Sequence, residues 1–410
     1  MTRGDKYEIK PIDHAILMTS PGEQRPAHIL PVIIFSQFAG TSLWFAGNAV
    51  LDDLARAWQL APAALGYITS AVQVGFICGT LVFAFLALAD RLSPRKVFLG
   101  CAAAGALANI AVLAAPPQLA TLLICRFATG FFLAGIYPVG MKIASGWYRS
   151  GLGNALGFLV GALVLGTAFP HLLKALGQAW QWQTVLLAVS AIALAGGVLM
   201  YLLVPDGPYL ANGARFDPRA LRQVFSSREF RASAFGYFGH MWELYAFWAF
   251  VPFVLAACAP GWSVPLWSFV IIAAGALGCV GGGLVSLRIG SARVAFAQLA
   301  ASGICCLLSP LLLLASPAQV VAFLVFWGIV VVGDSPQFSA LNAAHAPRER
   351  VGSALTIGNS IGFAITIGSI QLLNLAAHRV DANWLFLLLA PGPAFGLWAL
   401  RPLLAARKPA

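Results

Sequence analysis

The sequence has little charge for its length. Only 10% of its 410 residues are Asp, Glu, Lys or Arg, whereas a soluble globular chain carries about a quarter. Hydrophobic residues make up 60% of the chain, and one water-soluble core could not hide that much apolar surface. The composition therefore excludes a soluble protein and predicts one whose surface lies in lipid.

The sequence also lacks the motifs of an enzyme or an ATP-driven pump. It has no Gly-x-x-x-x-Gly-Lys-[Ser/Thr] phosphate loop, no metal-ligand cluster, and no nucleophile and base at a persuasive spacing. The seven cysteines all fall within apolar runs, so we expect them to be small buried hydrophobes rather than metal ligands. We therefore expect no enzymatic activity, no cofactor and no metal.

Apolar segments long enough to cross a bilayer recur twelve times. Because about 20 helical residues cross about 30 Å of hydrocarbon, each of these segments predicts a transmembrane helix. The predicted spans are residues 29–51, 63–89, 97–115, 119–145, 151–173, 183–204, 230–258, 264–287, 294–315, 318–342, 351–376 and 384–400. They define an all-α membrane protein with a tail at 1–28, six-helix bundles at 29–204 and 230–400, a linker at 205–229, and a tail at 401–410.

The basic residues lie mostly between the spans, where they indicate the orientation. With the N-terminus inside, only Arg56, Lys174 and Arg379 fall outside and Arg126 falls within a span, which leaves 21 of the 25 Lys and Arg residues cytoplasmic. We therefore expect both termini in the cytoplasm. The arginines of the linker fit a short helix at the anionic membrane surface better than a nucleic-acid site.

The two halves of the chain repeat at a shift of about 200 residues. Gly135-Ile-Tyr-Pro138 matches Gly333-Asp-Ser-Pro336, and Gly153-Asn-Ala-Leu156 matches Gly352-Ser-Ala-Leu355. A third match aligns the loop after span 2 with the loop after span 8. Matches in the same order at nearly one shift indicate a duplicated six-helix unit.

Two motifs resemble those of the major facilitator superfamily. The segment Asp90-Arg91-Leu92-Ser93-Pro94-Arg95-Lys96 resembles its loop signature, usually Gly-x-x-x-Asp-Arg-x-Gly-Arg-Arg, with departures at Leu86, Ser93 and Pro94. In span 4, Arg126-Phe-Ala-Thr-Gly130 resembles the Arg-x-x-x-Gly element. The resemblance covers essentially the whole chain. It implies two pseudo-symmetric bundles, with spans 1, 4, 7 and 10 around a central cavity.

The same resemblance assigns roles to charged residues. It implies that Asp90, Arg91, Arg95 and Lys96 form a gating cluster that holds the halves together at the inner side. Positive charge that only fixes topology is the alternative for the basic members. The resemblance also implicates Arg126 in proton coupling, with anion binding or pairing to a carboxylate as alternatives.

Ionisable residues deep in the spans are the main candidates for function, because each charge there costs about 2.5–3.5 kcal/mol. They are Arg126 in span 4, Glu243 in span 7 and Asp334 in span 10, and His240 shares a helix face with Glu243. We expect these four to bind substrate or couple protons. The alternatives are a fixed ion pair or hydrogen bond between helices for Glu243, and a capping or bridging role at a broken turn for Asp334.

Polar and aromatic side chains on the spans expected around the cavity, or beside them, are predicted to line it. They are Gln37, Trp44, Asn48, Tyr137, Trp242, Tyr245 and Asn359. Packing or a lipid-facing position is the alternative for the tryptophans. His171, near the outer end of span 5, fits a place at the membrane interface.

These features predict a secondary active transporter that moves a small solute by alternating access, coupled to protons. The short loops and alanine-rich composition fit a bacterial inner membrane. We expect a monomer whose partners are the solute, protons and the bilayer, without nucleic acid. An uncoupled facilitator of the same fold and a non-transporting membrane sensor remain alternatives, and the sequence leaves open the solute and the direction of transport.

Overall fold

The computed structural model describes residues 26–148, 152–177, 180–210, 224–347, 350–377 and 379–405. These residues are mostly helical and contain no strand. The first half holds α1 (Ile29–Thr41), α2 (Ala46–Ala49), α3 (Leu51–Trp58), α4 (Ala64–Phe85), α5 (Leu88–Arg91), α6 (Pro94–Ile110), η1 (Ala111–Leu113), α7 (Leu119–Leu133), α8 (Tyr137–Trp147), α9 (Leu152–Leu176) and α10 (Trp182–Leu203). The second half holds α12 (Arg228–Cys258), α13 (Val264–Ile289), α14 (Ser291–Leu308), η2 (Ser309–Leu314), α15 (Pro317–Gly333), α16 (Ser335–His345), α17 (Val351–Ala376), α18 (Ala382–Leu385), η4 (Phe386–Leu389) and α19 (Pro391–Ala405).

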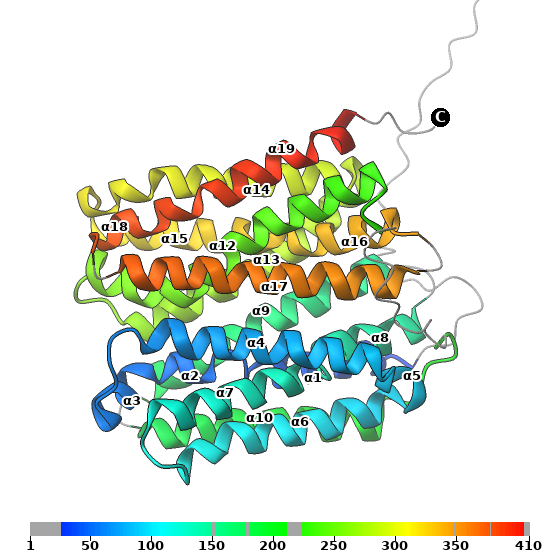
Figure 1. Cartoon of the computed structure of the whole chain (residues 1–410), viewed down its shortest axis with the longest axis horizontal. Coiled ribbons are helices and arrows are strands. Elements are labelled where there is room, and N and C mark those ends of the chain that lie inside the picture. The colour runs from blue at the N-terminus through cyan, green and yellow to red at the C-terminus, as the bar shows by residue number, and fades with distance from the viewer. Residues whose placement is uncertain are drawn as a thin grey trace, which may run out of the picture.

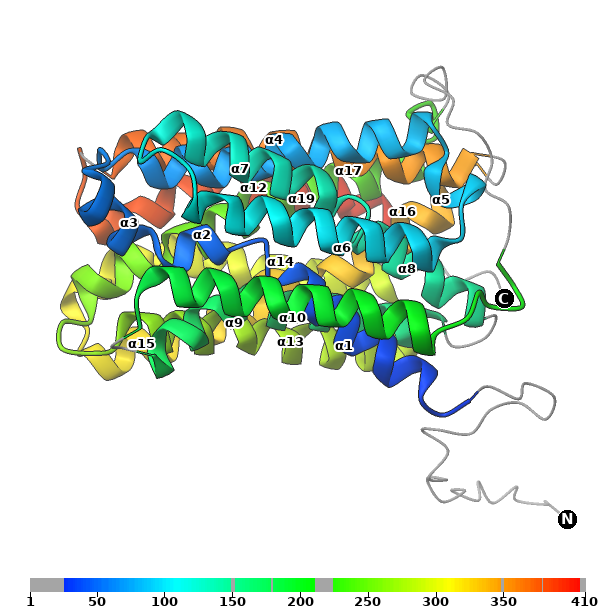
Figure 2. The same ribbon diagram turned by 90° about the horizontal axis from the view of Figure 1, so that it is seen from below.

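The long helices run side by side along one axis, and the two halves lie next to each other. In Figure 1 the helices up to α10 lie below those from α12 onward. Figures 1 and 2 both place α3 at one end of the bundle and α5 with α16 at the other. We call these the α3 end and the α5 end. Of the predicted linker, residues 211–223 lie outside the described ranges.

The predicted spans agree with the helices, apart from the first. Within the described ranges, eleven helices are long and apolar enough to cross a membrane, and α1 is a shorter apolar helix. The predicted span 29–51 is interrupted after Thr41 and continues in α2 and α3. Near the interruption, Thr41 Oγ1 donates to Gln37 O (2.8 Å) and Ser42 Oγ donates to Ala39 O (2.6 Å). Such back-bonding bends helices, and it helps to explain the break.

Spans 4 and 10 are broken at equivalent places. Span 4 consists of α7 and α8, which begins one residue before Pro138, and span 10 consists of α15 and α16, which begins one residue before Pro336. Proline has no backbone N–H to continue the helical ladder. Both breaks fall in the repeated Gly-x-x-Pro segments, so the sequence repeat corresponds to a structural one.

Equivalent helices also cross closely in both halves. In the first half, a Cβ added at Gly75 of α4 would lie 2.0 Å from Phe127 O of α7. In the second half, a Cβ at Gly278 of α13 would lie 1.8 Å from Ile329 O of α15. Only glycine allows such approach of helix backbones. Spans 2 and 4 therefore pack as spans 8 and 10 do.

The most extensive contacts between the halves are those of α4 with α17 and of α9 with α13. The α4–α17 contact carries polar bonds at the α3 end. Gln371 Nε2 donates to Gly66 O (3.0 Å) and Ser70 Oγ (2.8 Å), while Asn374 Nδ2 donates to Ala63 O (3.1 Å) and its Oδ1 accepts from Gly66 N (3.3 Å). We call this set of bonds the α4–α17 clasp. It holds the halves together directly at the α3 end.

Candidate functional site

His240 and Asp334 form a buried pair between α12 and the break of span 10. His240 Nδ1 lies 2.8 Å from Asp334 Oδ1, and each side chain is 1% exposed. Asp334 occupies the junction of α15 and α16 but makes no side-chain capping bond to α16. The predicted capping role is therefore absent at this junction, whereas a bridge between helices is present. Within the described residues, neither ring nitrogen of His240 and neither carboxyl oxygen of Asp334 has a partner in hydrogen-bond geometry, so the 2.8 Å contact is a close approach of two ionisable groups rather than an aligned hydrogen bond.

Glu243 lies one helical turn from His240 and binds two other helices. Its Oε1 accepts from Trp327 Nε1 of α15 (2.7 Å) and from Ser302 Oγ of α14, and Cys306 Sγ lies 3.5 Å away. Glu243 is 1% exposed. All these partners belong to the second half, so the carboxylate faces the interior of that bundle rather than the first half.

Arg126 stabilises the broken first span. Its Nη2 donates to Leu43 O (3.1 Å) and Trp44 O (2.5 Å), which are backbone carbonyls in the interruption between α1 and α2. Gly47 favours the close approach of α2, because a Cβ there would lie 3.0 Å from Arg126 Nε, which is tighter than an ordinary contact. Arg126 thus supplies hydrogen bonds that a continuous helix would have supplied itself.

A second guanidinium nitrogen links Arg126 to two more helices. Nη1 donates to Asn109 Oδ1 of α6 (3.1 Å), and Asn109 Nδ2 donates to Ser190 Oγ (3.0 Å) and Leu186 O (3.3 Å) of α10. In the described part of the chain, no carboxylate lies within salt-bridge distance of Arg126. Arg126 therefore lies in the first half, whereas His240, Glu243 and Asp334 lie in the second.

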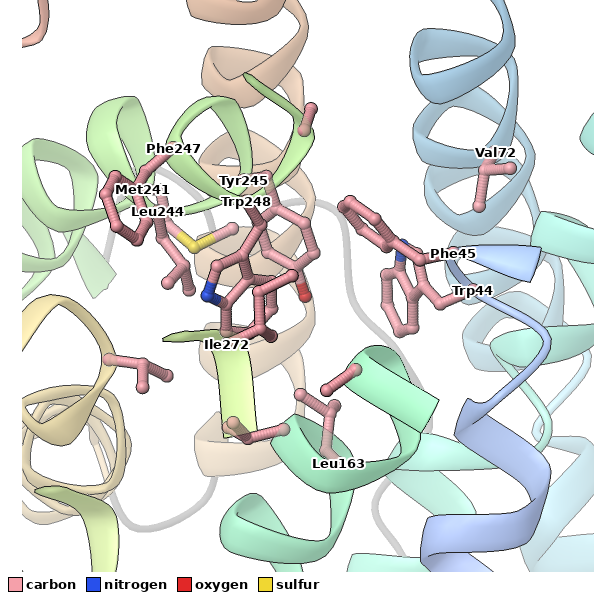
Figure 3. Close-up of a cluster of buried hydrophobic side chains, with 14 of the residues drawn as sticks. Trp44, Phe45, Val72, Leu163, Met241, Leu244, Tyr245, Phe247, Trp248 and Ile272 are labelled. Carbon is pink, nitrogen blue, oxygen red and sulfur yellow. The ribbon is translucent and has the colours of Figure 1, made fainter. Parts of the chain in front are cut away.

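An aromatic cluster closes the space between the halves. It consists of Trp44, Phe45 and Phe76 from the first half and Tyr245, Trp248 and Phe363 from the second. Figure 3 shows Trp44 and Phe45 opposite Tyr245 and Trp248. The Trp44 and Phe363 rings stack 5.6 Å apart, and the Phe45 and Trp248 rings meet edge to face at 6.2 Å. The six side chains are nearly inaccessible to solvent.

A cavity of about 360 Å³ lies between the halves at the α3 end. Its walls come from α2, α3, α4 and α9 of the first half and from α12, α13 and α17 of the second. We call it the α3-end cavity. Asn48, His171 and Asn374 are among its polar lining residues, and Asp52 is exposed at its edge. The cavity lies beside the aromatic cluster, because Asn48 follows Trp44 by four residues and Ala249 follows Trp248 directly.

The residues predicted to line a cavity are distributed over four settings. Asn48 lines the α3-end cavity, and Trp44 and Tyr245 belong to the aromatic cluster. Gln37 is buried within the first half against Gly140, and Trp242 Nε1 donates to Leu388 O (3.4 Å) within the second half. Tyr137 on α8 and Asn359 on α17 are half-buried.

The loop predicted to gate the inner side contacts its own half. Arg95 Nη1 donates to Tyr201 O of α10 (3.3 Å), and the Arg95 guanidinium lies 5.4 Å from the centre of the Tyr201 ring. Arg91 and Lys96 are exposed at the α5 end. The side chain of Asp90 lies outside the described residues. Among the described side chains, no ion pair joins this loop to the second half.

The sequence did not reveal three polar residues at the interface of the halves. His171 fits a membrane-interface position by its place in the span, but the structure buries it to 3% exposure in the cavity wall. Gln371 and Asn374 form the clasp. Their amide side chains look ordinary in an apolar span, and only the position of α4 opposite α17 gives them a role.

The fold defines a class of protein, a multi-pass membrane protein built from two related helical bundles. In the residues described, no group of three or more His, Cys, Asp and Glu side chains could hold a metal ion. A model of the Major Facilitator Superfamily matches residues 32–406, and the chain belongs to that superfamily. The family and the two-bundle architecture expected from the loop motif and the repeat are therefore confirmed.

Known proteins resemble the chain at low identity. The niacin transporter NiaP of Acinetobacter baylyi is 30% identical over 179 residues, covering 41% of this chain and 38% of NiaP. The uncharacterized transporter YgaY of Escherichia coli is 27% identical over 192 residues, covering 44% of this chain and 47% of YgaY. The matched segments thus span less than half of these relatives. The crystal structure of the human organic anion transporter MFSD10 has a TM-score of 0.69 at 14% identity, covering 92% of this chain and 100% of that one.

Proposed function

We propose that this protein is a secondary active transporter that moves a small solute across a bacterial inner membrane by alternating access, coupled to protons. The pseudo-symmetric interface supports alternating access. The halves meet through α4 with α17 and through α9 with α13, pairs that the internal repeat relates to each other. Halves joined in this way can rock about the middle, so that the passage opens to one side at a time.

The position of the buried His240–Asp334 pair carries the proposal of proton coupling. We propose that the two groups, whose Nδ1 and Oδ1 atoms lie 2.8 Å apart, hold one proton between them, either as an imidazolium with a carboxylate or as two neutral groups. Adding a second proton or removing the shared one leaves a net charge in a buried place, which is costly. A change in proton number therefore favours a conformation in which the pair reaches water.

The break of span 10 connects this charge change to movement. Asp334 lies where α15 ends and α16 begins, and Pro336 leaves that junction without one backbone hydrogen bond. Glu243 binds α15 through Trp327, one turn along α12 from His240. Protonation of either carboxylate would thus alter how α12 holds span 10, which gives the proton a direct effect on the position of the helices.

The distribution of basic residues supports an orientation with both termini in the cytoplasm. Arg91, Lys96 and Arg231 lie at the α5 end, whereas Arg56 and Lys174 lie at the α3 end. Cytoplasmic segments carry the excess of Lys and Arg. In this orientation the α5 end faces the cytoplasm and the α3 end faces outward.

The test of coupling compares accumulation with exchange in proteoliposomes. A thermal-shift screen that includes niacin, the solute in the name of NiaP, first identifies a stabilising solute. Glu243→Gln is expected to abolish accumulation of that solute driven by a pH gradient while counterflow exchange remains measurable. Accumulation at the wild-type level in this variant would contradict the coupling role of Glu243.

A matched control uses the same substitution on the same helix. Glu229 lies exposed in the first turn of α12, and Glu229→Gln is expected to accumulate solute as the wild type does. Wild-type flux that is independent of the pH gradient would instead identify an uncoupled facilitator. Absence of flux for every stabilising solute would leave a membrane sensor as the better description.

A further inference from the structure

A groove of about 330 Å³ lies between the start of α12 and the end of α19. The two helices cross closely further along, where a Cβ added at Gly239 would lie 2.4 Å from Gly392 O. The groove opens between them toward the α5 end, where Figure 1 shows both helix ends. We call it the α12–α19 groove. Its lining residues all belong to the second half, so it is separate from the interface of the halves and from the α3-end cavity.

Three arginines line the α12–α19 groove. Arg228 and Arg231 come from one face of α12, and Arg401 comes from α19. In the described residues, no carboxylate lies within salt-bridge distance of any of them. The adjacent Glu229 does not line the groove and accepts from Ser227 Oγ (3.1 Å) instead. Like charges gathered in one groove repel each other, so an anion from outside the chain would stabilise them.

The protein backbone holds one of these guanidinium groups in place. Arg231 Nη1 donates to Phe225 O (2.7 Å) and Ser226 O (2.8 Å). A guanidinium has five N–H donors, so these bonds fix its orientation and leave further donors for a ligand. Its planar fork matches two oxygens of a phosphate group. Arg228 and Arg401 are exposed and can adapt to the same anion.

Exposed aromatic rings adjoin the arginines. Trp398 is 61% exposed, and Phe395, 43% exposed, lies one turn before it on α19. The Phe395 ring lies 6.0 Å from the Trp398 ring and 5.9 Å from the Phe235 ring of α12. Exposed tryptophans in membrane proteins gather where headgroups meet acyl chains. Arg401 follows these rings toward the helix end, so the charged part of the groove lies on the water side of its apolar part.

The geometry points to the α12–α19 groove as a binding site for an anionic phospholipid. The three arginines hold its phosphate, and Phe395 and Trp398 contact its acyl chains. A free phosphate would use the arginines but not the exposed rings, which favours the lipid as the source of the phosphate. In the proposed orientation the α5 end faces the cytoplasm, and basic pockets between spans on that side bind anionic headgroups. The inference goes beyond the proposed function, because it concerns neither the solute nor the proton.

Native mass spectrometry of the purified full chain in an uncharged detergent tests the chemistry of the site. Phosphatidylglycerol and phosphatidylcholine with the same acyl chains differ in net charge, and glycerol 3-phosphate carries a phosphate without chains. Phosphatidylglycerol is expected to bind saturably and about tenfold or more tighter than phosphatidylcholine, and equimolar glycerol 3-phosphate is expected to leave it bound. Equal binding of the two lipids would overturn the inference. Displacement by glycerol 3-phosphate would identify a free-phosphate site and overturn the lipid assignment.

Two double variants of equal charge test the location of the site. Arg228→Gln/Arg401→Gln removes two exposed charges from the groove and keeps Arg231 with its backbone bonds. The control Arg288→Gln/Arg293→Gln removes two exposed charges at the turn between α13 and α14, outside the groove. The groove variant is expected to bind phosphatidylglycerol about tenfold or more weakly, and the control as the wild type does. Equal weakening in both variants, or undiminished binding in the groove variant, would overturn the site.

A tryptophan variant tests the contact with the acyl chains. Trp398→Ala keeps all three arginines and is expected to weaken phosphatidylglycerol binding by about threefold or more, because the lipid loses apolar contact area. The control Trp384→Ala alters a tryptophan that is 50% exposed on α18, outside the groove, and should bind the lipid as the wild type does. Undiminished binding in Trp398→Ala would overturn the assignment of the acyl chains to this surface.

Discussion

The glycine at the crossing of α13 and α15 offers a prediction whose size follows from the geometry. A Cβ at Gly278 would lie 1.8 Å from Ile329 O and 3.3 Å from Gly333 Cα, whereas ordinary contacts begin near 3.4 Å. Gly278→Ala therefore forces the two backbones apart by more than 1 Å. Gly281 lies one turn further along α13, and an added Cβ there meets nothing within 4 Å. Gly278→Ala and Gly281→Ala are thus the same substitution on the same helix, and they differ only in whether the added Cβ meets a neighbouring atom.

The expected difference in unfolding temperature between these two variants combines two effects. Overpacking a close crossing costs about 1–3 kcal/mol, and replacing Gly by Ala in a helix returns up to about 1 kcal/mol. Gly281→Ala shows only the second effect, so its unfolding temperature in detergent should equal or exceed that of the wild type. Gly278→Ala should unfold at a clearly lower temperature. It should also lose solute accumulation, because α15 carries the break at Asp334.

Thermal unfolding followed by tryptophan fluorescence measures the difference, with size-exclusion chromatography to show that each variant is monodisperse. The repeat makes a second comparison available. Gly75→Ala on α4 should behave as Gly278→Ala does, and Gly100→Ala on α6, with nothing within 4 Å, should behave as Gly281→Ala does. If Gly278→Ala and Gly281→Ala unfolded at the same temperature, the close crossing inferred from the backbone would be refuted.

Three further predictions concern charged side chains. Arg126→Met should lower the unfolding temperature, because three buried oxygens lose their donors at about 1–3 kcal/mol each; unchanged stability would contradict the role of Arg126 at the break. His240→Gln and Asp334→Asn should be non-additive in unfolding free energy by about 0.5–3 kcal/mol, and strict additivity in the double variant would exclude a direct pair. Burial raises the pKa of Asp53, but the bonds from Lys174 and Arg56 outweigh this effect and lower that pKa overall. The ion pairs of Asp53 therefore stabilise the fold above its unfolded-state pKa, and this stabilisation is lost as the pH falls through its folded-state pKa. The unfolding temperatures of the wild type and Asp53→Asn should therefore converge as the pH is lowered toward 3, and a constant difference would contradict this.

Much of the fold follows from sequence because lipid imposes simple requirements on a chain. Each span must be apolar and about 20 residues long, so the span boundaries can be read from hydropathy. The matching Gly-x-x-Pro segments at Gly135 and Gly333 mark the two equivalent helix breaks, since glycine and proline act on the local backbone. The break in the first span could not be read in this way. Its freed carbonyls are satisfied by Arg126, 83 residues from Leu43, and that bond depends on the position that α7 takes in the folded bundle, where it packs against α4 and α6.

The candidate site was only partly predictable for a similar reason. Helical spacing places His240 and Glu243 on related faces, and the buried charges stand out in apolar segments. Spacing cannot show that Glu243 turns toward α14 and α15, or that Arg126 lies apart from the buried carboxylates Glu243 and Asp334. It also cannot show that His171 lines a cavity, because the rest of that wall comes from other helices, including three in the second half.

The central claim is that protons move with the solute because buried carboxylates of the second half change protonation during transport. Parallel recording of solute uptake and internal pH in one proteoliposome preparation tests it most directly. The account predicts that adding solute to wild-type vesicles without an imposed gradient changes the internal pH, and that Glu243→Gln vesicles, which still exchange solute, show no such change. Solute uptake by the wild type with a constant internal pH would contradict it.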